Sequence, residues 1–462
     1  MRYLKIIICF FLLHNSVSAQ EMWGISNSNF SGNMGIFLNP TTIIGAPYQY
    51  EINLAALDQF AENTFLFLPL DQKIITISLT NKVRNRKNYY TNSSGLQNGF
   101  SHELIIGPSY IHNKTKSAWG IHSAFRSGLS ILKIHSELAL LFSDYFKTPQ
   151  SFGAKFTSGP FSSAFASWLE LGGTYGKIYK ENEKNVIKWA ATANLLIGQN
   201  GYSYEGRSFD FTSIDSSQLI IHNYNATFSH TIDDNGFGFH GLGLSTTIGV
   251  SYIKNPNRGA FDCNMSNDKQ RKYKYRLGFS LLDLGMIHFF GDAAIYNVSN
   301  PNDYVWNGVD TINLNSFQSI DTSLLIHVGG NIQKKNFNIW LPLAISVQFD
   351  YQLRPNVFAN ASIVNRIHFK TNQVARGNQL NLSLRYERRR YEGALSFSLF
   401  EYKKPSLGLG LRYRFLVVGS DRLLQLLNLS DAPSLDFFIG IKFQFCKKPF
   451  SKGPDCPAYL GQ

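Results

Sequence analysis

The chain has 462 residues, of which 44% are hydrophobic and 14% aromatic, whereas only 16% are charged. Soluble domains usually carry about 25% charged residues, so this composition argues against an ordinary soluble domain. The formal net charge is +13, but the basic residues are dispersed along the chain apart from Arg388–Arg390. A dispersed charge is not the basic patch that typifies a nucleic-acid-binding protein.

The first predicted element is a signal peptide over residues 1–19. Arg2 and Lys5 precede a short apolar run, and Val17 and Ala19 occupy the −3 and −1 positions of a small-residue cleavage site. The run is too short to cross about 30 Å of hydrocarbon, so we expect cleavage rather than a membrane anchor. Export further argues against nucleic acid as a partner, and it makes anionic lipid headgroups and lipopolysaccharide the expected neighbours of a basic chain.

Residues 20–46 precede the first clear strand and have two interpretations. If the strands that follow close into a barrel, this segment either lies inside the lumen as a plug or forms a disordered periplasmic lead-in. The candidate plug residues are Asn33, Asn39 and Pro40.

From residue 47 onward, apolar and polar residues alternate over segments of about ten residues, the length that a tilted membrane strand needs. The clearest segments are Tyr48–Leu57, Ser117–Arg126, Leu380–Glu387, Leu407–Phe415 and Leu435–Phe445. Strands of soluble sandwiches also alternate, but they average only about five to six residues and their apolar face is less aromatic.

We therefore predict an all-β fold in which residues 47–445 form one transmembrane antiparallel β-barrel of about 14 strands, with 16 as the upper bound. No apolar run after residue 20 reaches the roughly 18 residues of a membrane helix. Short helical insertions are expected between strands, over Ile134–Phe146 and, more weakly, over Arg422–Leu429.

Charged side chains on the polar faces of the predicted strands are expected to point into the lumen, because a charge facing hydrocarbon costs about 2–4 kcal/mol at the midplane. The candidates are Glu51, His122, Arg126, Glu170, Lys188, Arg276, Arg385, Glu387, Arg412, Arg414 and Lys442. They either bind an acidic headgroup or tune a pore, or they form Arg–Glu networks that fill a closed barrel. The sequence favours the second interpretation.

Residues 446–462 form a predicted periplasmic tail, in which Cys446 and Cys456 are candidates for a disulfide in an oxidising compartment. A metal site is the weaker alternative, since the tail contains no histidine. Gly236–Gly241 fits a GxGxxG pattern, but a strand-like sequence follows it instead of the helix that a dinucleotide needs. We therefore expect no metal, no cofactor and no enzymatic activity.

Several stretches together resemble a Bacteroidota family of outer-membrane barrels of unknown function (DUF5723-like). That family is related to the long-chain fatty-acid transporter FadL and to PorV-like barrels of the type IX secretion system. The matching stretches are Gly32–Ile44, Trp168–Tyr175, Tyr273–Phe289, Leu341–Tyr351, Arg385–Glu387 and Gly408–Asp421. Their order and spread carry the resemblance rather than any single motif.

The resemblance implies a FadL-like barrel in the cell outer membrane. The function that it implies is a channel or transporter for hydrophobic or amphipathic small molecules. The alternative is a non-transporting accessory or structural barrel, whose partners would be subunits of a secretion or assembly complex.

Overall fold

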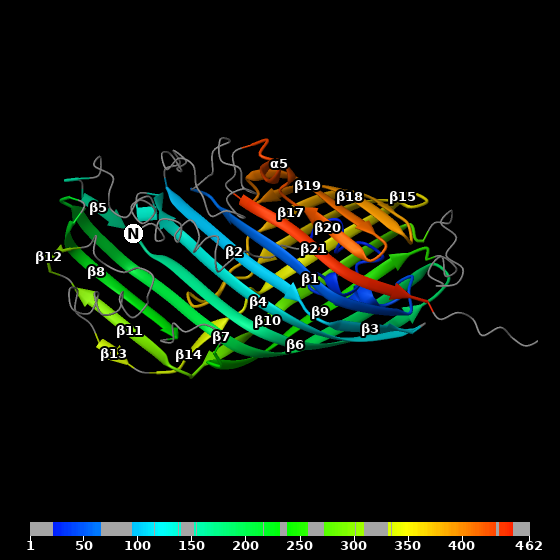
Figure 1. The fold of residues 1–462 in the computed structure, drawn as a ribbon, viewed down its shortest axis with the longest axis horizontal. Helices are drawn as coiled ribbons and strands as arrows, with labels where there is room; N and C mark the ends of the chain where they lie inside the picture. The colour runs from blue at the N-terminus through cyan, green and yellow to red at the C-terminus, as the bar shows by residue number, and fades with distance from the viewer. Residues whose placement is uncertain are drawn as a thin grey trace, which may run out of the picture.

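The structure is a computed structural model, and it describes residues 22–65, 95–114, 116–136, 138–139, 152–153, 155–215, 217–231, 238–256, 272–300, 302–308, 331–333, 335–430 and 434–446. The predicted signal peptide lies outside these residues, as does the tail after residue 446. The described strands form a closed antiparallel barrel of 14 strands, which confirms the predicted fold (Figure 1). In the described part of the chain, no helix has the length and hydropathy needed to span a membrane.

The wall closes because β1 (Tyr50–Asn63) pairs on one edge with β2 (Leu96–Ile106) and on the other with the last strand, β21 (Ser434–Phe445). Two positions in the wall are each occupied by two strands that follow one another end to end. These are β2 followed by β3, and β14 followed by β15. Between β1 and β21 the remaining wall strands are β3 (Ser109–Asn113), β4 (Ser117–His135), β6 (Phe161–Glu181), β7 (Asn185–Ser213), β9 (Gly241–Lys254), β10 (Tyr275–Phe289), β14 (Phe337–Trp340), β15 (Ala344–Arg354), β16 (Val357–Arg366), β17 (Gln379–Glu387), β18 (Tyr391–Phe400), β19 (Lys404–Tyr413) and β20 (Leu416–Ser420).

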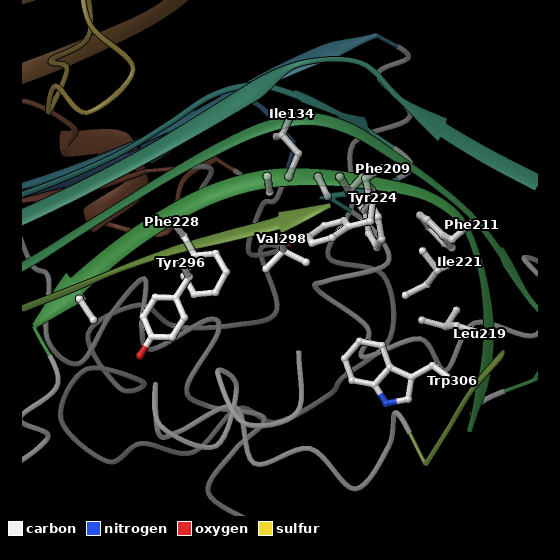
Figure 2. Close-up of a cluster of buried hydrophobic side chains, with 14 residues drawn as sticks. Ile134, Phe209, Phe211, Leu219, Ile221, Tyr224, Phe228, Tyr296, Val298 and Trp306 are labelled. Atoms are coloured by element: carbon white, nitrogen blue, oxygen red, sulfur yellow. The ribbon is translucent and has the colours of Figure 1, made fainter. Parts of the chain in front are cut away.

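The same sheet extends beyond the barrel along the second half of β7, and we call this extension the wing. The first half of β7 pairs with β9, and its second half pairs with β8. The wing strands lie together at the left of Figure 1: β5 (Lys155–Ser158), β8 (Gln218–Thr231), β11 (Ala293–Asn300), β12 (Tyr304–Asn307) and β13 (Asn331–Gln333). One face of the wing carries a buried aromatic cluster, in which the rings of Phe228 and Tyr296 stack with centroids 4.7 Å apart (Figure 2). The period-two alternation of the sequence did not predict the wing.

The barrel strands place apolar residues outside and polar residues inside. Along β17, Leu382 and Leu384 are 49% and 51% exposed, whereas Asn381 and Arg385 on either side of them are fully buried. Successive side chains of a strand point to opposite faces, so period-two alternation turns one apolar face outward all around the ring. An exposed apolar face on every wall strand is the arrangement that lipid requires.

The two ends of the barrel differ. At the turn end, two or three residues join β3 to β4, β6 to β7, β15 to β16, β17 to β18 and β19 to β20, and β1 begins beside the end of β21. Aromatic rings from neighbouring strands contact one another along this end. They include Tyr110 with Trp119 at 5.5 Å, Tyr252 with Tyr275 at 6.1 Å and Phe415 with Phe443 at 5.5 Å. Such a girdle is typical of a membrane–water interface.

The opposite, loop end carries the wing and most of the longer connections, although the connection from β9 to β10, residues 255–274, starts and ends at the turn end. The helical insertion predicted over Ile134–Phe146 begins at the loop end, but β4 takes Ile134 and His135, and only residues 136, 138 and 139 are described as helical. The rest of that prediction lies outside the described residues. The weaker helical prediction contains the one-turn helix α5 (Leu423–Leu426).

Candidate functional site

The lumen of the barrel is occupied by the chain's own residues 22–49, which we call the lumenal segment. It contains two short 3-10 helices, η1 (Gly32–Met34) and η2 (Pro40–Ile43). Asn39 caps η2, since its side-chain oxygen accepts from the backbone N–H of Thr41 at 3.0 Å. Proline at the first position of η2 lacks an N–H that would have no partner there anyway. The three plug candidates, Asn33, Asn39 and Pro40, are all buried.

Charged side chains of the wall hold this segment near the turn end. Glu51 of β1 accepts from the backbone N–H of Asn33 at 2.7 Å. Lys442 of β21 donates to the carbonyl oxygens of Phe30 and Ser31, each at 2.6 Å. Because these donors and acceptors are buried, each bond satisfies a group that would otherwise be desolvated without a partner.

Further contacts reach the segment from other sides of the ring. Lys188 of β7 donates to the carbonyl oxygen of Ile44 at 2.7 Å. The indole N–H of Trp23 donates to Gln379 of β17 at 2.6 Å, and Asn39 donates to Gln348 of β15 at 2.9 Å. Contacts from β1, β7, β15, β17 and β21 surround the segment, which places it inside the ring of strands.

A buried ion network crosses the lumen toward the loop end. Arg126 of β4 donates through both terminal nitrogens to the two carboxylate oxygens of Asp283 on β10, each at 2.8 Å. Arg126 also lies 3.2 Å from Glu170, whose other oxygen is 3.1 Å from Nε2 of His122. Arg376, from the connection between β16 and β17, reaches Asp283 at 2.6 Å. The network joins three wall strands to a connection that folds inward.

A second network lies on the opposite wall. Arg385 of β17 contacts Asp350 of β15 at 2.9 Å and Glu387 at 3.0 Å. Glu387 in turn accepts from the side-chain amide of Asn29 at 2.8 Å, which links the network to the lumenal segment. Arg276 of β10 donates to the carbonyl oxygen of Asn27 at 2.5 Å and lies 3.5 Å from Asp350.

Arg412 forms a third inward pair, since its Nε lies 3.0 Å from Glu392 on the neighbouring strand β18. Ten of the predicted lumen residues therefore lie on the inner side of the wall, in these networks or in contact with the lumenal segment. Arg414 is the exception and corrects the prediction. Strand β19 ends at Tyr413, and Arg414 occupies the following turn with a φ of +52° and an exposed side chain.

Strand periodicity missed several partners of these charges. Asp283 lies on a β-bulge of β10, where the register against β9 shifts between Leu281 and Leu284. Arg376 lies in a connection, and so does Arg422, which pairs with Glu62 of β1 at 2.6 Å. Bulges and connections have no period-two signal, so only a search for opposite charges within apolar stretches such as that around Asp283 would have identified them.

The wall is interrupted beside the first network. β10 pairs with β15 as far as Leu282 and Ala344, and pairing resumes with β14 at Met286 and Trp340. Between these points the partner strand carries Pro342, which has no backbone N–H to donate. The backbone N–H of Leu341 still donates to the carbonyl oxygen of Gly285 at 3.1 Å, so the interruption is short. On its far edge, β14 pairs with the connection after β16, since Trp340 forms backbone hydrogen bonds with Asn372 and Val374 at 3.1 and 3.0 Å.

A cavity of about 50 Å³ adjoins this interruption. Its apolar lining comes from the lumenal segment and the wall: Met22, Met34, Phe37, Leu104, Trp168 and Pro342. Arg126, Arg376, Asp58 and His102 supply its polar side. Ser26, Glu103 and Ser127 also line the cavity, so its surface is about evenly divided between apolar and polar side chains.

Within the described residues, no group of three or more His, Cys, Asp or Glu side chains could hold a metal ion. Cys446, directly after β21, is disulfide-bonded. Its predicted partner Cys456 lies outside the described residues, so the pairing stays a prediction.

A closed antiparallel ring with an apolar exterior, an aromatic girdle and an inward set of charges defines a transmembrane β-barrel protein. The sequence model of DUF5723, a family of unknown function, matches residues 41–421, and the chain belongs to that family. No curated protein matches the sequence.

Solved structures similar to this chain include two toluene transporters. The TbuX transporter of Ralstonia pickettii has a TM-score of 0.41 and 10% identity, with 90% of this chain and 94% of that chain covered. The TodX transporter of P. putida also has a TM-score of 0.41 and 10% identity, with 91% and 95% covered. A TodX mutant described as a monoaromatic hydrocarbon channel has a TM-score of 0.43. Identities and scores this low assign no substrate to this chain.

Proposed function

We propose that this protein is an outer-membrane channel through which a hydrophobic or amphipathic small molecule passes. The observation that carries the proposal is the interrupted strand pairing between β10 and β14–β15, with a cavity of mixed apolar and polar lining directly inside it. A molecule that partitions into lipid can enter such a barrel from the side, whereas a hydrophilic solute does not reach an opening that faces hydrocarbon. The predicted signal peptide and the lipid-facing exterior support an outer-membrane location.

The lumenal segment is the gate in this proposal. Small-molecule pockets usually enclose about 300–1,000 Å³, so the present cavity of about 50 Å³ holds no such ligand until its lining moves. Met22, Met34 and Phe37 of the lumenal segment form much of that lining. A shift of this segment away from the wall interruption would enlarge the cavity and connect it to the rest of the lumen.

A second candidate is an accessory or structural barrel without transport. The buried ion networks favour it, because Arg126, Arg385 and Arg412 are all paired and a sealed lumen needs nothing more. Its partners would be subunits of a secretion or assembly complex that recognise the loop end or the wing.

Permeability of a Gram-negative host that produces the protein separates these candidates. We expect faster entry of the hydrophobic dye N-phenyl-1-naphthylamine, and unchanged entry of a hydrophilic cephalosporin measured by its hydrolysis in the periplasm. Faster entry of both probes would indicate a water-filled pore and contradict the proposal. If neither probe enters faster, the accessory barrel is favoured, and a stoichiometric partner should co-purify from native membranes.

A further inference from the structure

A second cavity lies at the turn end, where the lumenal segment meets the last strand, away from the wall interruption. Its volume is about 210 Å³. The turn between β17 and β18 contributes Arg389 and Arg390, and the turn between β19 and β20 contributes Arg414. We call this cavity the turn-end pocket.

The pocket combines three arginines with an aromatic wall. Phe415 and Phe443 stack with ring centroids 5.5 Å apart, and Phe443 stacks on Phe445 at 6.3 Å. Phe30 and Tyr48 of the lumenal segment complete the apolar side. These rings belong to the girdle of the turn end, so the pocket lies at the level of the membrane–water interface.

Among the described residues, Arg389, Arg390 and Arg414 form no ion pair with a carboxylate, and no acidic side chain of these residues lines the pocket. Arg389 also donates through Nη2 to the sulfur of Cys446 at 3.4 Å. Lys442, a fourth cation of the lining, is already bonded to two carbonyl oxygens of the lumenal segment.

Buried groups fix the position of the two turns. The Arg412 guanidinium, paired with Glu392, donates to the carbonyl oxygens of Arg388 and Arg389 at 2.8 and 3.1 Å. The backbone N–H of Arg414 donates to the carbonyl oxygen of Arg390 at 2.6 Å, which ties one turn to the other. The pocket is therefore held in shape before any ligand arrives, and a preformed site loses less entropy on binding.

We propose that the turn-end pocket binds the phosphate headgroup of a membrane phospholipid. Guanidinium groups donate in a planar fork that suits phosphate oxygens, and three of them meet here without a carboxylate to compete. The aromatic rings pack against the glycerol and upper acyl carbons, which lie at the same depth in the membrane. Lipid bound here would anchor the turn end whether or not the barrel transports anything.

The test measures lipid retention by native mass spectrometry. The purified full chain is released from nanodiscs made of equal parts phosphatidylglycerol and phosphatidylcholine. The variant R389Q/R390Q/R414Q removes the three exposed arginines without touching the inward networks. The matched control K114Q/K116Q/K184Q removes the same charge from exposed residues in two other turns at the same end. Folding of each variant is checked by the heat-dependent gel shift of barrels.

We expect one phosphatidylglycerol to be retained by the native chain and by the lysine control. The arginine variant should lose at least about tenfold in retention, since it gives up several charge-assisted hydrogen bonds. Equal loss in both variants would show general charge attraction and overturn the proposal. Displacement of the lipid by millimolar inorganic phosphate would overturn it in favour of a free-phosphate site. Dye entry through the barrel is scored separately, so failure here leaves the transport proposal untouched.

Discussion

Arg126 on β4 and Asp283 on β10 meet across the lumen, where each terminal guanidinium nitrogen lies 2.8 Å from one of the two carboxylate oxygens. The two strands are separated in the wall by β6, β7 and β9, so this pair ties distant parts of the ring together. Asp283 also binds Arg376, and loss of its charge would leave two buried guanidinium groups without their shared partner.

Replacement of Asp283 by asparagine should therefore destabilise the barrel by about 3–5 kcal/mol, the usual effect of removing one partner of a buried ion pair. Urea unfolding in lipid vesicles, followed by tryptophan fluorescence, measures the change. The control is E205Q, because Glu205 and Arg207 form an exposed pair 3.8 Å apart. Exposed pairs contribute about 0–1 kcal/mol. A D283N variant as stable as E205Q would show that the network does not hold the wall.

An alanine substitution at Gly32 tests whether the contact with Glu51 retains the lumenal segment. Its φ is +59°, and a Cβ at this position would contact the carboxylate of Glu51, which holds Asn33. Gly45 has a similar φ of +68° but open space around it. Both alanine variants therefore share a left-handed strain of about 1–2 kcal/mol, and only G32A adds the collision.

We expect limited proteolysis of the folded barrel to cut the lumenal segment of G32A faster than that of G45A. The gel shift of the barrel itself should be the same in both variants. If the two alanine variants are cut at equal rates, the contact with Glu51 is not what retains the segment.

Because the exterior of the wall faces lipid, the loss of stability caused by an exposed arginine should depend strongly on its position. Leu395, in the middle of β18, is 53% exposed, and Leu429, in the connection before β21, is 66% exposed. Arginine at position 395 should cost about 2–4 kcal/mol of stability in a bilayer, because the charge faces hydrocarbon. Arginine at position 429 should change stability by less than about 0.5 kcal/mol. Equal effects in urea titrations would mean that β18 does not face lipid.

Sequence periodicity predicted the barrel because every wall strand must turn one apolar face toward lipid. Glu51, Arg385 and Lys442 could be identified as inward residues from their neighbours alone, since each alternates with exposed apolar residues. What these charges contact could not be predicted this way. Asn33, Asp350 and the carbonyl oxygens of Phe30 and Ser31 come from other strands or from the lumenal segment, and local alternation carries no information about the far wall.

The wing and the wall interruption also escaped prediction, for a related reason. β7 is 29 residues long, and its alternation of buried residues shifts by one at Gly198 and Gln199, where its partner changes from β9 to β8. Local alternation does not identify the partner strand on either side of this shift. Pro342 lies in the apolar stretch Leu341–Tyr351, but the sequence does not show that β10 changes its partner from β15 to β14 at this proline. Arg414 was placed inside because alternation was extended one residue past the end of β19.

Movement of the lumenal segment is the central claim of the transport proposal, and a disulfide that fixes the segment tests it most directly. The hydroxyl oxygens of Thr41, in the segment, and Ser251, on β9, lie 2.5 Å apart, so the variant T41C/S251C can close a bridge. The control T174C/T192C joins two adjacent wall strands whose hydroxyl oxygens are 2.8 Å apart. We predict that oxidised T41C/S251C abolishes the gain in dye entry and that a membrane-permeant reductant restores it, while the control is unaffected. Undiminished dye entry through the oxidised T41C/S251C barrel would contradict a gate formed by the lumenal segment.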